Sequence, residues 1–185
     1  MAEAAVRTAE PGDTHDIARI QVETWQTAYA DLLPREVLDS LDAEEIARIW
    51  ELTMAGGDAT VYVATEGPFT VGFCAAGPAP EEEVADVDGT VPDDAATTGM
   101  VGTLLVEPRW GRRGHGGRLL ATAAQAMREA GSTRGVVWVP ENDDVSIAFY
   151  ERAGWERDGM VRTLDADGQA LREIRLTGDL DFRLT

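Results

Sequence analysis

The sequence predicts an α/β (α+β) fold in which one central sheet, mixed but mostly antiparallel, is flanked by helices. Two observations favour this class. Apolar strand-like segments alternate along the chain with segments whose apolar residues fall on one helical face, and no repeat or linker interrupts the 185 residues. The chain is 44% hydrophobic but only 6% aromatic, so it can bury a core made mainly of aliphatic side chains. We therefore expect residues 1–185 to form a single domain, since about 150 residues per domain is typical.

The first part of the chain is expected to fold as a strand, two helices and a hairpin. Pro11 and Gly12 break the chain after the first strand, so Asp13 or Thr14 can cap the helix that follows. The expected elements are a strand at 4–9, a helix at about 14–29, a helix at about 37–52 that stops at Gly56 and Gly57, and strands at 61–65 and 69–77. Because only three residues separate the last two strands, we expect them to pair as a hairpin.

The second part is expected to complete the mixed sheet. Residues 78–98 are expected to form an exposed acidic loop, since they contain three prolines, many Asp and Glu residues and almost no large apolar side chain. The remaining elements are a strand at 100–108, a helix at 116–130 before Gly131, a strand at 135–139, a helix at 143–153 before Gly154, and strands at 160–165 and 170–176 turned by Asp167 and Gly168.

The composition excludes several classes of protein. Asp and Glu number 34 against 16 arginines, and the net charge of −18 makes nucleic acid and anionic membrane surfaces poor partners. With one cysteine, Cys74, and two histidines, His15 and His115, the chain has neither an internal disulfide nor a convincing zinc set. The sequence contains no apolar run of about 18 residues and no basic-then-apolar leader. We expect a cytoplasmic protein without a metal, outside membranes.

Residues 108–128 invert the charge of the chain. This window holds five arginines and no acidic residue. Gly114, Gly116 and Gly117 come directly before the expected helix, where backbone N–H groups can approach an anion without a Cβ in the way. The helix N-terminus adds partial positive charge. The pattern favours a phosphate or pyrophosphate site, and the alternative is a glycine-rich turn with solvated surface arginines.

Two common nucleotide-binding motifs do not fit this window. The dinucleotide fingerprint G-x-G-x-x-G would need a third glycine at the position of Leu119. The motif G-x-x-x-x-G-K needs a lysine, and the sequence contains none. The window therefore disfavours both a nucleotide-dependent oxidoreductase and a nucleoside triphosphatase.

The segment VEPRWGRRGHGGRLL at 106–120 resembles motif A of the GNAT superfamily of acetyl-CoA-dependent N-acetyltransferases. That motif has an apolar residue, a proline, an aromatic residue, then Q/R-x-x-G-x-G/A and a pair of leucines. The matching residues are Val106, Pro108, Trp110, Gly114, Gly116, Leu119 and Leu120. Gly111 stands where the family has Gln or Arg, and the adjacent Arg112 can supply the missing charge.

A second segment carries the resemblance independently. PENDDVSIAFYERAGW at 140–155 resembles the family's motif B, with Asn142 at the strand end, Phe149 and Tyr150 on the helix, and a Gly-aromatic pair at 154–155. Weaker agreement covers most of the chain. Two motifs in the family's order and spacing form a specific signal, and the resemblance implies the GNAT acyl-CoA N-acyltransferase fold.

The resemblance implies that acetyl-CoA is the cofactor and that coenzyme A leaves as the product. It implies that strands 100–107 and 135–139 splay apart, that the pantetheine arm pairs with the backbone of the first, and that an amide there polarises the thioester carbonyl. The glycine turn would hold the pyrophosphate. The implied cofactor-binding residues are Leu104, Leu105, Val106, Arg112, Arg113, Gly114, His115, Gly116, Gly117, Asn142 and Ser146.

Tyr150 is the expected catalytic acid. A leaving thiolate resembles a free cysteine with a pKa of about 8.5, so a phenol with a pKa of about 10 can protonate it. The alternative for Tyr150 is a buried tyrosine with a satisfied hydroxyl. Asn142 is as readily a turn or cap residue beside Asp143, and Ser146 is a weaker candidate on the same helix.

The sequence defines the general base and the acceptor pocket less sharply. Glu107 is expected at the surface because a proline follows it, and Glu23, Asp31 or a water chain stay open as the base. Trp25 and Tyr29 lie one helical turn apart, where they would either line the acceptor pocket or fill the core.

The predicted function is transfer of the acetyl group of acetyl-CoA to a primary amine by direct attack in a ternary complex. The acidic composition favours a small cationic amine or a peptide N-terminus as acceptor. The alternative is a non-catalytic acyl-CoA-binding or sensor module on the same fold. A homodimer is expected only by analogy with relatives.

Overall fold

A computed structural model describes residues 3–166 and 168–181 of the chain. The described residues form a seven-stranded sheet with the hydrogen-bonded order β1-β2-β3-β4-β5-β7-β6. They cluster into two compact units, Met1–Ala75 with Thr103–Ala123 and Ala76–Gly102 with Ala124–Thr185. Strand β4 (Thr98–Val106) and helix α5 (His115–Glu129) contribute to both units. The predicted mixed α/β fold is confirmed, whereas the single domain stays a prediction.

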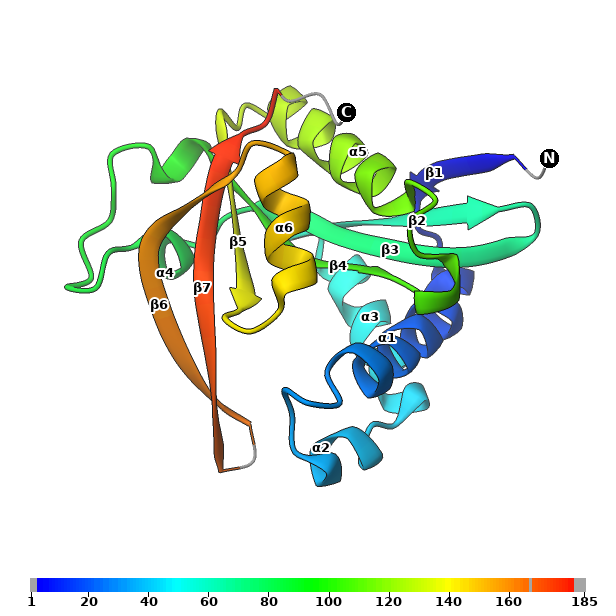
Figure 1. The fold of residues 1–185 in the computed structure, drawn as a ribbon. Helices are drawn as coiled ribbons and strands as arrows, with labels where there is room; N and C mark the ends of the chain where they lie inside the picture. The colour runs from blue at the N-terminus through cyan, green and yellow to red at the C-terminus, as the bar shows by residue number, and fades with distance from the viewer. Residues whose placement is uncertain (1–2, 167, 182–185) are drawn as a thin grey trace. The chain divides into compact units, whose positions relative to one another are not determined.

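The first unit combines one end of the sheet with a pair of packed helices (Figure 1). Its elements, besides the end of β4 and the start of α5, are β1 (Ala4–Thr8), the 3-10 turn η1 (Pro11–Asp13), α1 (Thr14–Ala28), α2 (Arg35–Asp39), α3 (Ala43–Gly56), β2 (Thr60–Glu66), most of β3 (Phe69–Pro78) and the 3-10 turn η3 (Pro108–Trp110). Strands β1 and β2 are antiparallel, with Ala4 opposite Glu66.

The core of the first unit forms because α1 and α3 each place their apolar residues on one face. Ile17 and Ile20 of α1 are fully buried, together with Val63 of β2 and Phe73 of β3. Trp50 of α3 meets Phe73 edge-on at a centroid distance of 5.1 Å. This packing fixes α1 against the strands and leaves its polar face free to line a site.

Two details of this unit differ from the prediction. The helix expected at 37–52 is two helices, α2 and α3, because the Asp42 carboxylate accepts two backbone N–H groups of the first turn of α3 and so starts a new helix. The Asp13 side chain does not cap α1. It accepts the backbone N–H of Glu10 and pairs with Arg7 at 2.7 Å, since the guanidinium is the stronger partner.

The second unit contains the other end of the sheet, in which β5 pairs with β4 on one side and with β7 on the other. Its elements, besides the start of β4 and the end of α5, are α4 (Glu81–Val84), the 3-10 turn η2 (Ala95–Thr97), β5 (Arg134–Pro140), α6 (Asp144–Arg152), β6 (Glu156–Ala166) and β7 (Gln169–Asp179). β4 and β5 are parallel, and their pairing ends with Val101 opposite Val137. β7 runs antiparallel to both β5 and β6. Of the predicted turn residues, Gly168 has a φ of 85°, and Asp167 lies outside the described residues.

The acidic segment 78–98 is only partly the exposed loop that its composition predicts. Val84 and Ala95 are buried, and they pack with Val136 of β5. The buried Arg175 side chain donates to two backbone carbonyls at the end of α4. Two small apolar contacts and the bonds from Arg175 thus help to hold a segment in which most residues are exposed.

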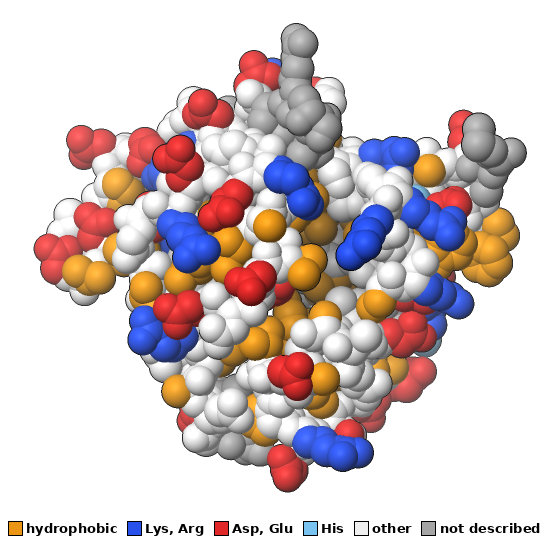
Figure 2. Space-filling view, viewed as in Figure 1, with side chains coloured by type: hydrophobic (Ala, Val, Ile, Leu, Met, Phe, Trp, Pro, Cys, Tyr) orange, Lys and Arg blue, Asp and Glu red, His pale blue; other side chains and the backbone are white. Residues whose placement is uncertain are grey.

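Acidic side chains are spread over the face of the molecule seen in Figure 2, and arginines stand among them. Many arginines of the described chain pair with carboxylates, as Arg134 does with Asp94 at 2.8 Å. Within the described part of the chain, no helix is long and apolar enough to cross a membrane.

Candidate functional site

The glycine turn, residues 111–117, connects η3 to α5 in the first unit. Helix α5 begins at His115, so Gly116 and Gly117 lie inside its first turn. The expectation that these two glycines come directly before the helix is wrong. Gly114 has a φ of 81°, and Arg112 has a φ of 61° although it carries a side chain. Both residues are therefore in the left-handed region, and the chain turns sharply before the helix.

Free backbone donors collect at this helix start. Arg118 donates its N–H to the carbonyl of Gly114 at 3.1 Å, which is the first bond of the helical series. The N–H groups of residues 115–117 precede it, where no helical carbonyl faces them. With the partial positive charge of the helix end, these donors can bind a phosphate group.

The arginines of the basic window have different partners. Arg113 pairs with Glu66 at 3.0 Å and lies 4.8 Å above the Trp110 ring, and Arg109 pairs with Glu107. For the guanidinium of Arg112, by contrast, no hydrogen bond or ion pair is found within the described residues. Arg112 is the arginine of the turn that a bound anion can engage without displacing a carboxylate.

His115 is buried, and its side chain anchors the turn to β2. Its exposed fraction is 1%, and its Nε2 lies 2.8 Å from an oxygen of Glu66. Desolvation raises the pKa of Glu66, but the hydrogen bond with His115 and the charge of Arg113 outweigh it and lower that pKa overall. Sequence reasoning missed Glu66, because 49 residues separate it from His115 and only the tertiary structure brings the end of β2 to the start of α5.

The end of β4 holds the residues predicted to meet the pantetheine arm. Leu104, Leu105 and Val106 lie beyond Val101, the last residue of β4 that pairs with β5 among the described residues. On its other side β3 approaches closely at Gly72, where an added Cβ would lie 2.8 Å from the Leu105 carbonyl oxygen.

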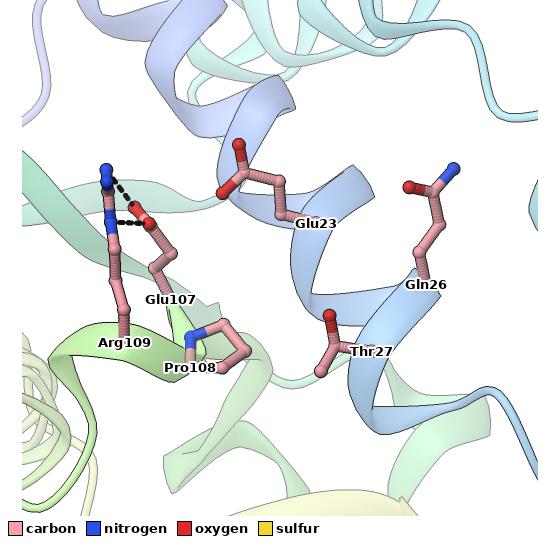
Figure 3. A pocket seen from close by; sticks show the side chains of 6 residues that line it. All are labelled: Glu23, Gln26, Thr27, Glu107, Pro108 and Arg109. Atoms are coloured by element: carbon pink, nitrogen blue, oxygen red, sulfur yellow. Dashed lines mark hydrogen bonds and ion pairs between the residues drawn. The ribbon is translucent and has the colours of Figure 1, made fainter.

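A hollow of about 400 Å³ lies beside α1 in the first unit (Figure 3). Its lining residues are Glu23, Gln26, Thr27, Glu107, Pro108 and Arg109. The prediction that Glu107 lies at the surface is wrong, since only 2% of the residue is exposed. Arg19 contacts its carboxylate at 2.8 Å and Arg109 engages it from the neighbouring turn, which makes a buried charge tolerable.

The aromatic pair predicted to line an acceptor pocket lies elsewhere on α1. Trp25 and Tyr29 are half-buried, with ring centroids 5.9 Å apart. Trp25 packs against the core of the first unit, and neither residue lines the hollow. An acceptor role for Trp25 and Tyr29 stays a prediction.

The remaining candidate residues lie on or before α6 in the second unit. Tyr150 is buried, with its ring 5.3 Å from that of Trp155. Asp143 caps α6, and it accepts both the N–H and the hydroxyl of Ser146 at 3.0 and 2.7 Å. The residue that caps α6 is therefore Asp143 and not Asn142, which is exposed in the turn before the helix.

Two other kinds of chemistry find little support in the described residues. Burial raises the pKa of the Cys74 thiol to about 12, so this side chain is a poor nucleophile. No group of three His, Cys, Asp or Glu side chains within residues 3–166 and 168–181 is placed to hold a metal ion.

Comparison with known proteins gives a consistent result. The family model described as "Acetyltransferase (GNAT) family" matches residues 15–155. The curated protein "Uncharacterized N-acetyltransferase YuaI" of Bacillus subtilis (strain 168) is 33% identical over 172 residues, which is 92% of this chain and 90% of that protein.

Solved structures share the fold. The N-acetyltransferase from Staphylococcus aureus Mu50 matches with a TM-score of 0.73 at 16% identity, covering 97% of this chain and 100% of that one. The PaiA N-acetyltransferase from Thermoplasma acidophilum, in complex with coenzyme A, matches with a TM-score of 0.70 at 16% identity, covering 96% and 99%. At these identities the likeness concerns the fold alone.

Proposed function

Since the chain belongs to the GNAT acetyltransferase family, we propose that it transfers the acetyl group of acetyl-CoA to a primary amine by direct attack within a ternary complex. Acetyl-CoA supplies, when bound, an activated acetyl thioester and a diphosphate by which it can be held. The chain's own residues have four tasks: they bind the diphosphate, polarise the thioester, accept a proton from the amine and protonate the leaving thiolate.

The glycine turn is the observation that carries the proposal. Its N–H groups at residues 115–117, which have no helical carbonyl partner, and the guanidinium of Arg112, which is not paired with any of the described residues, fit a diphosphate in both charge and hydrogen-bonding capacity. Gly111 lacks the side chain that the family's Gln or Arg would supply, and Arg112 at the next position can replace its charge. The turn therefore supports a coenzyme A derivative over a ligand without phosphate.

Three further groups are proposed to hold the rest of the donor. Backbone groups at Leu104–Val106 pair with the pantetheine arm, and an N–H there polarises the thioester carbonyl as charge develops on its oxygen. The end of the β4–β5 pairing before this stretch supports such a role. Asn142 contacts the cofactor arm from its exposed turn, whereas the bond from Ser146 to Asp143 makes Ser146 the weaker candidate.

Tyr150 is the proposed proton donor to the leaving thiolate. We expect Tyr150→Phe to lower kcat by about 100-fold, because general acid catalysis commonly contributes that much. The Kd for acetyl-CoA, measured by calorimetry, should stay within about twofold of wild type. Unchanged kcat would refute the role, and loss of acetyl-CoA binding would assign Tyr150 to structure. Tyr62→Phe is a matched control, since Tyr62 is also buried but lies in β2.

The hollow beside α1 supports a cationic acceptor. It holds two carboxylates, Glu23 and Glu107, against the single guanidinium of Arg109. Glu107 is engaged by arginines, whereas Glu23 meets Arg19 only at 3.4 Å and has 47% of its side chain exposed. Glu23 is therefore available to bind the ammonium group of an acceptor. Of the two carboxylates considered as the general base, Glu23 lines the hollow and Asp31 does not. A water chain stays an alternative base.

The activity is tested by following free thiol released from acetyl-CoA with a panel of amines. The panel contains small cationic diamines, peptides with a free N-terminus and neutral amines, and mass spectrometry identifies the acetylated acceptor. We expect amine-dependent release, fastest with the cationic acceptors. Cys74 should not interfere, because burial raises its pKa to about 12.

The alternative function is an acyl-CoA-binding or sensor module on the same fold. The departure at Gly111 is the observation that favours it. Calorimetric binding of acetyl-CoA without thiol release for any amine would support the sensor module. Absence of binding would refute both functions. A cytoplasmic location and a homodimer stay predictions, and fractionation and light scattering test them.

A further inference from the structure

We infer that Glu66 and His115 are positioning residues, which hold the glycine turn in the conformation that binds the diphosphate. The group formed by Glu66, Arg113 and His115 is called the Glu66 clamp below. This inference rests on the proposed function, since it concerns the same binding turn, but neither residue needs to contact the ligand through its side chain.

The Glu66–His115 contact of the clamp is mostly buried and directional, whereas the Arg113 side chain is 52% exposed. An ionised carboxylate can only accept hydrogen bonds, so the 2.8 Å contact requires His115 to donate its Nε2–H to Glu66. The His115 ring is 1% exposed, and its other nitrogen, Nδ1, is buried with no hydrogen-bond partner in the part of the chain that the structure describes. One hydrogen bond thus sets the rotation of the ring, and Glu66 is its acceptor.

The clamp holds the glycine turn from both sides of Gly114. Arg113 and His115 flank Gly114, whose φ of 81° places it in a region where its own backbone has little restraint. The two oxygens of Glu66 contact one flank each, at 3.0 Å and 2.8 Å. Glu66 is in turn fixed by the sheet, because it lies opposite Ala4 in the β1–β2 ladder.

This anchoring bears directly on the donors of the binding turn. The backbone N–H of His115 is the first of the free donors at the start of α5, and its direction follows the orientation of the residue. A preorganised donor binds an anion without first losing conformational freedom, which raises affinity. We therefore expect a loosened clamp to weaken the binding of coenzyme A and its esters.

Because Glu66 is negatively charged, the inference can be tested by whether its removal weakens or strengthens binding of the anionic ligand. A carboxylate close to an anion-binding turn repels the ligand and also neutralises Arg113, so electrostatics alone predicts tighter binding once Glu66 is removed. Positioning predicts the opposite. Removal of Glu66 loosens both flanks of Gly114 and weakens binding, although the net charge becomes more favourable.

The experiment compares removal with conservative replacement at both ends of the clamp. Glu66→Met removes the acceptor, whereas Glu66→Gln keeps an oxygen in nearly the same place. His115→Asn is too short to reach Glu66, whereas His115→Gln presents an N–H close to the position of the imidazole Nε2. Glu129→Gln, at the far end of α5, is the control for loss of one negative charge. Calorimetry with coenzyme A gives Kd, and steady-state kinetics gives KM and kcat.

We expect Glu66→Met and His115→Asn to raise the Kd for coenzyme A and the KM for acetyl-CoA by about tenfold. Glu66→Gln and His115→Gln should restore most of the affinity, and kcat and the KM for the amine should stay near wild type. All measurements are made well below the thermal midpoint of each variant, so that loss of folding does not enter.

Three outcomes overturn the inference. Tighter binding by Glu66→Met means that only the charge matters, and unchanged Kd with a lowered thermal midpoint means that the clamp is merely structural. Equal weakening by the conservative and the removing variants means that the Glu66–His115 bond is not what positions the turn. Failure of the wild-type protein to bind coenzyme A is a separate result, which refutes the proposed function on which the inference rests.

Discussion

Glu107 is a carboxylate with 2% of its surface exposed, directly after the strand that is proposed to hold the pantetheine arm. Arg19 contacts it at 2.8 Å, and Arg109 engages it from the next turn. A buried charge is stable only with such partners, because removing one leaves the other uncompensated. The proline that follows Glu107 suggests a surface position, but an arginine 88 residues away decides its burial.

We expect Glu107→Ala to lower the free energy of unfolding by roughly 2–4 kcal/mol, because Arg19 then loses its buried partner. Asp16→Asn is the matched control, since it removes an exposed partner of the same arginine and should cost less than about 1 kcal/mol. Urea unfolding measures both. Similar small losses in the two variants would mean that Glu107 contributes no more than a surface ion pair.

At the scale of elements, β3 and β4 approach closely because Gly72 has no side chain. An added Cβ would lie 2.8 Å from the Leu105 carbonyl oxygen and 3.1 Å from a methyl group of Val106. The first of these neighbours is backbone, so it cannot yield by changing a rotamer. The spacing of these strands fixes the part of β4 that is proposed to contact acetyl-CoA.

We expect Gly72→Ala to destabilise the protein by roughly 1–3 kcal/mol, since the strands must separate to admit a methyl group. Gly12→Ala serves as the control, because no atom lies within 4 Å of a Cβ added there. Thermal and denaturant unfolding report the difference. Equal stability of the two variants would show that β3 and β4 adjust without cost.

At the scale of the whole molecule, the net charge of −18 opposes the compact state by repulsion. Ion pairs between arginines and carboxylates reduce this repulsion locally. The hydrogen bond from Arg7 is the main cause that lowers the pKa of Asp13, and the hydrogen bond from Arg134 similarly lowers the pKa of Asp94. A carboxyl group with a lowered pKa stabilises the folded state above its unfolded pKa of about 4, and this stabilisation is lost as pH falls through its folded pKa.

We therefore expect the stability difference between wild type and Asp13→Asn to be about 1–2 kcal/mol at pH 7. The difference should shrink below about pH 4, as the wild-type carboxyl group takes up a proton. Urea unfolding between pH 7 and pH 3 measures it, with Asp93→Asn, an exposed position, as the control. A difference that does not change with pH would contradict the pKa shift of Asp13.

Local sequence signals predict most elements and miss where several of them begin or end. The strands of the β2–β3 hairpin and helix α6 lie within two residues of their predicted ranges, because alternation and apolar faces are local properties. The break at Asp42 depends on which side chain satisfies the first backbone N–H groups of α3. Several side chains near a helix start can accept these N–H groups, and the sequence alone does not show which one does.

The sequence by itself determined the fold class, the family motifs and the place of the basic glycine turn, since each is written in neighbouring residues. Only the tertiary structure decided which charges in and around that turn are free. It joined Glu66 to His115, buried Glu107 between Arg19 and Arg109, and left the Arg112 guanidinium unpaired among the described residues. The Glu66–His115 and Arg19–Glu107 pairings link residues far apart in the chain, and their strength depends on burial and distance, which a linear pattern does not contain.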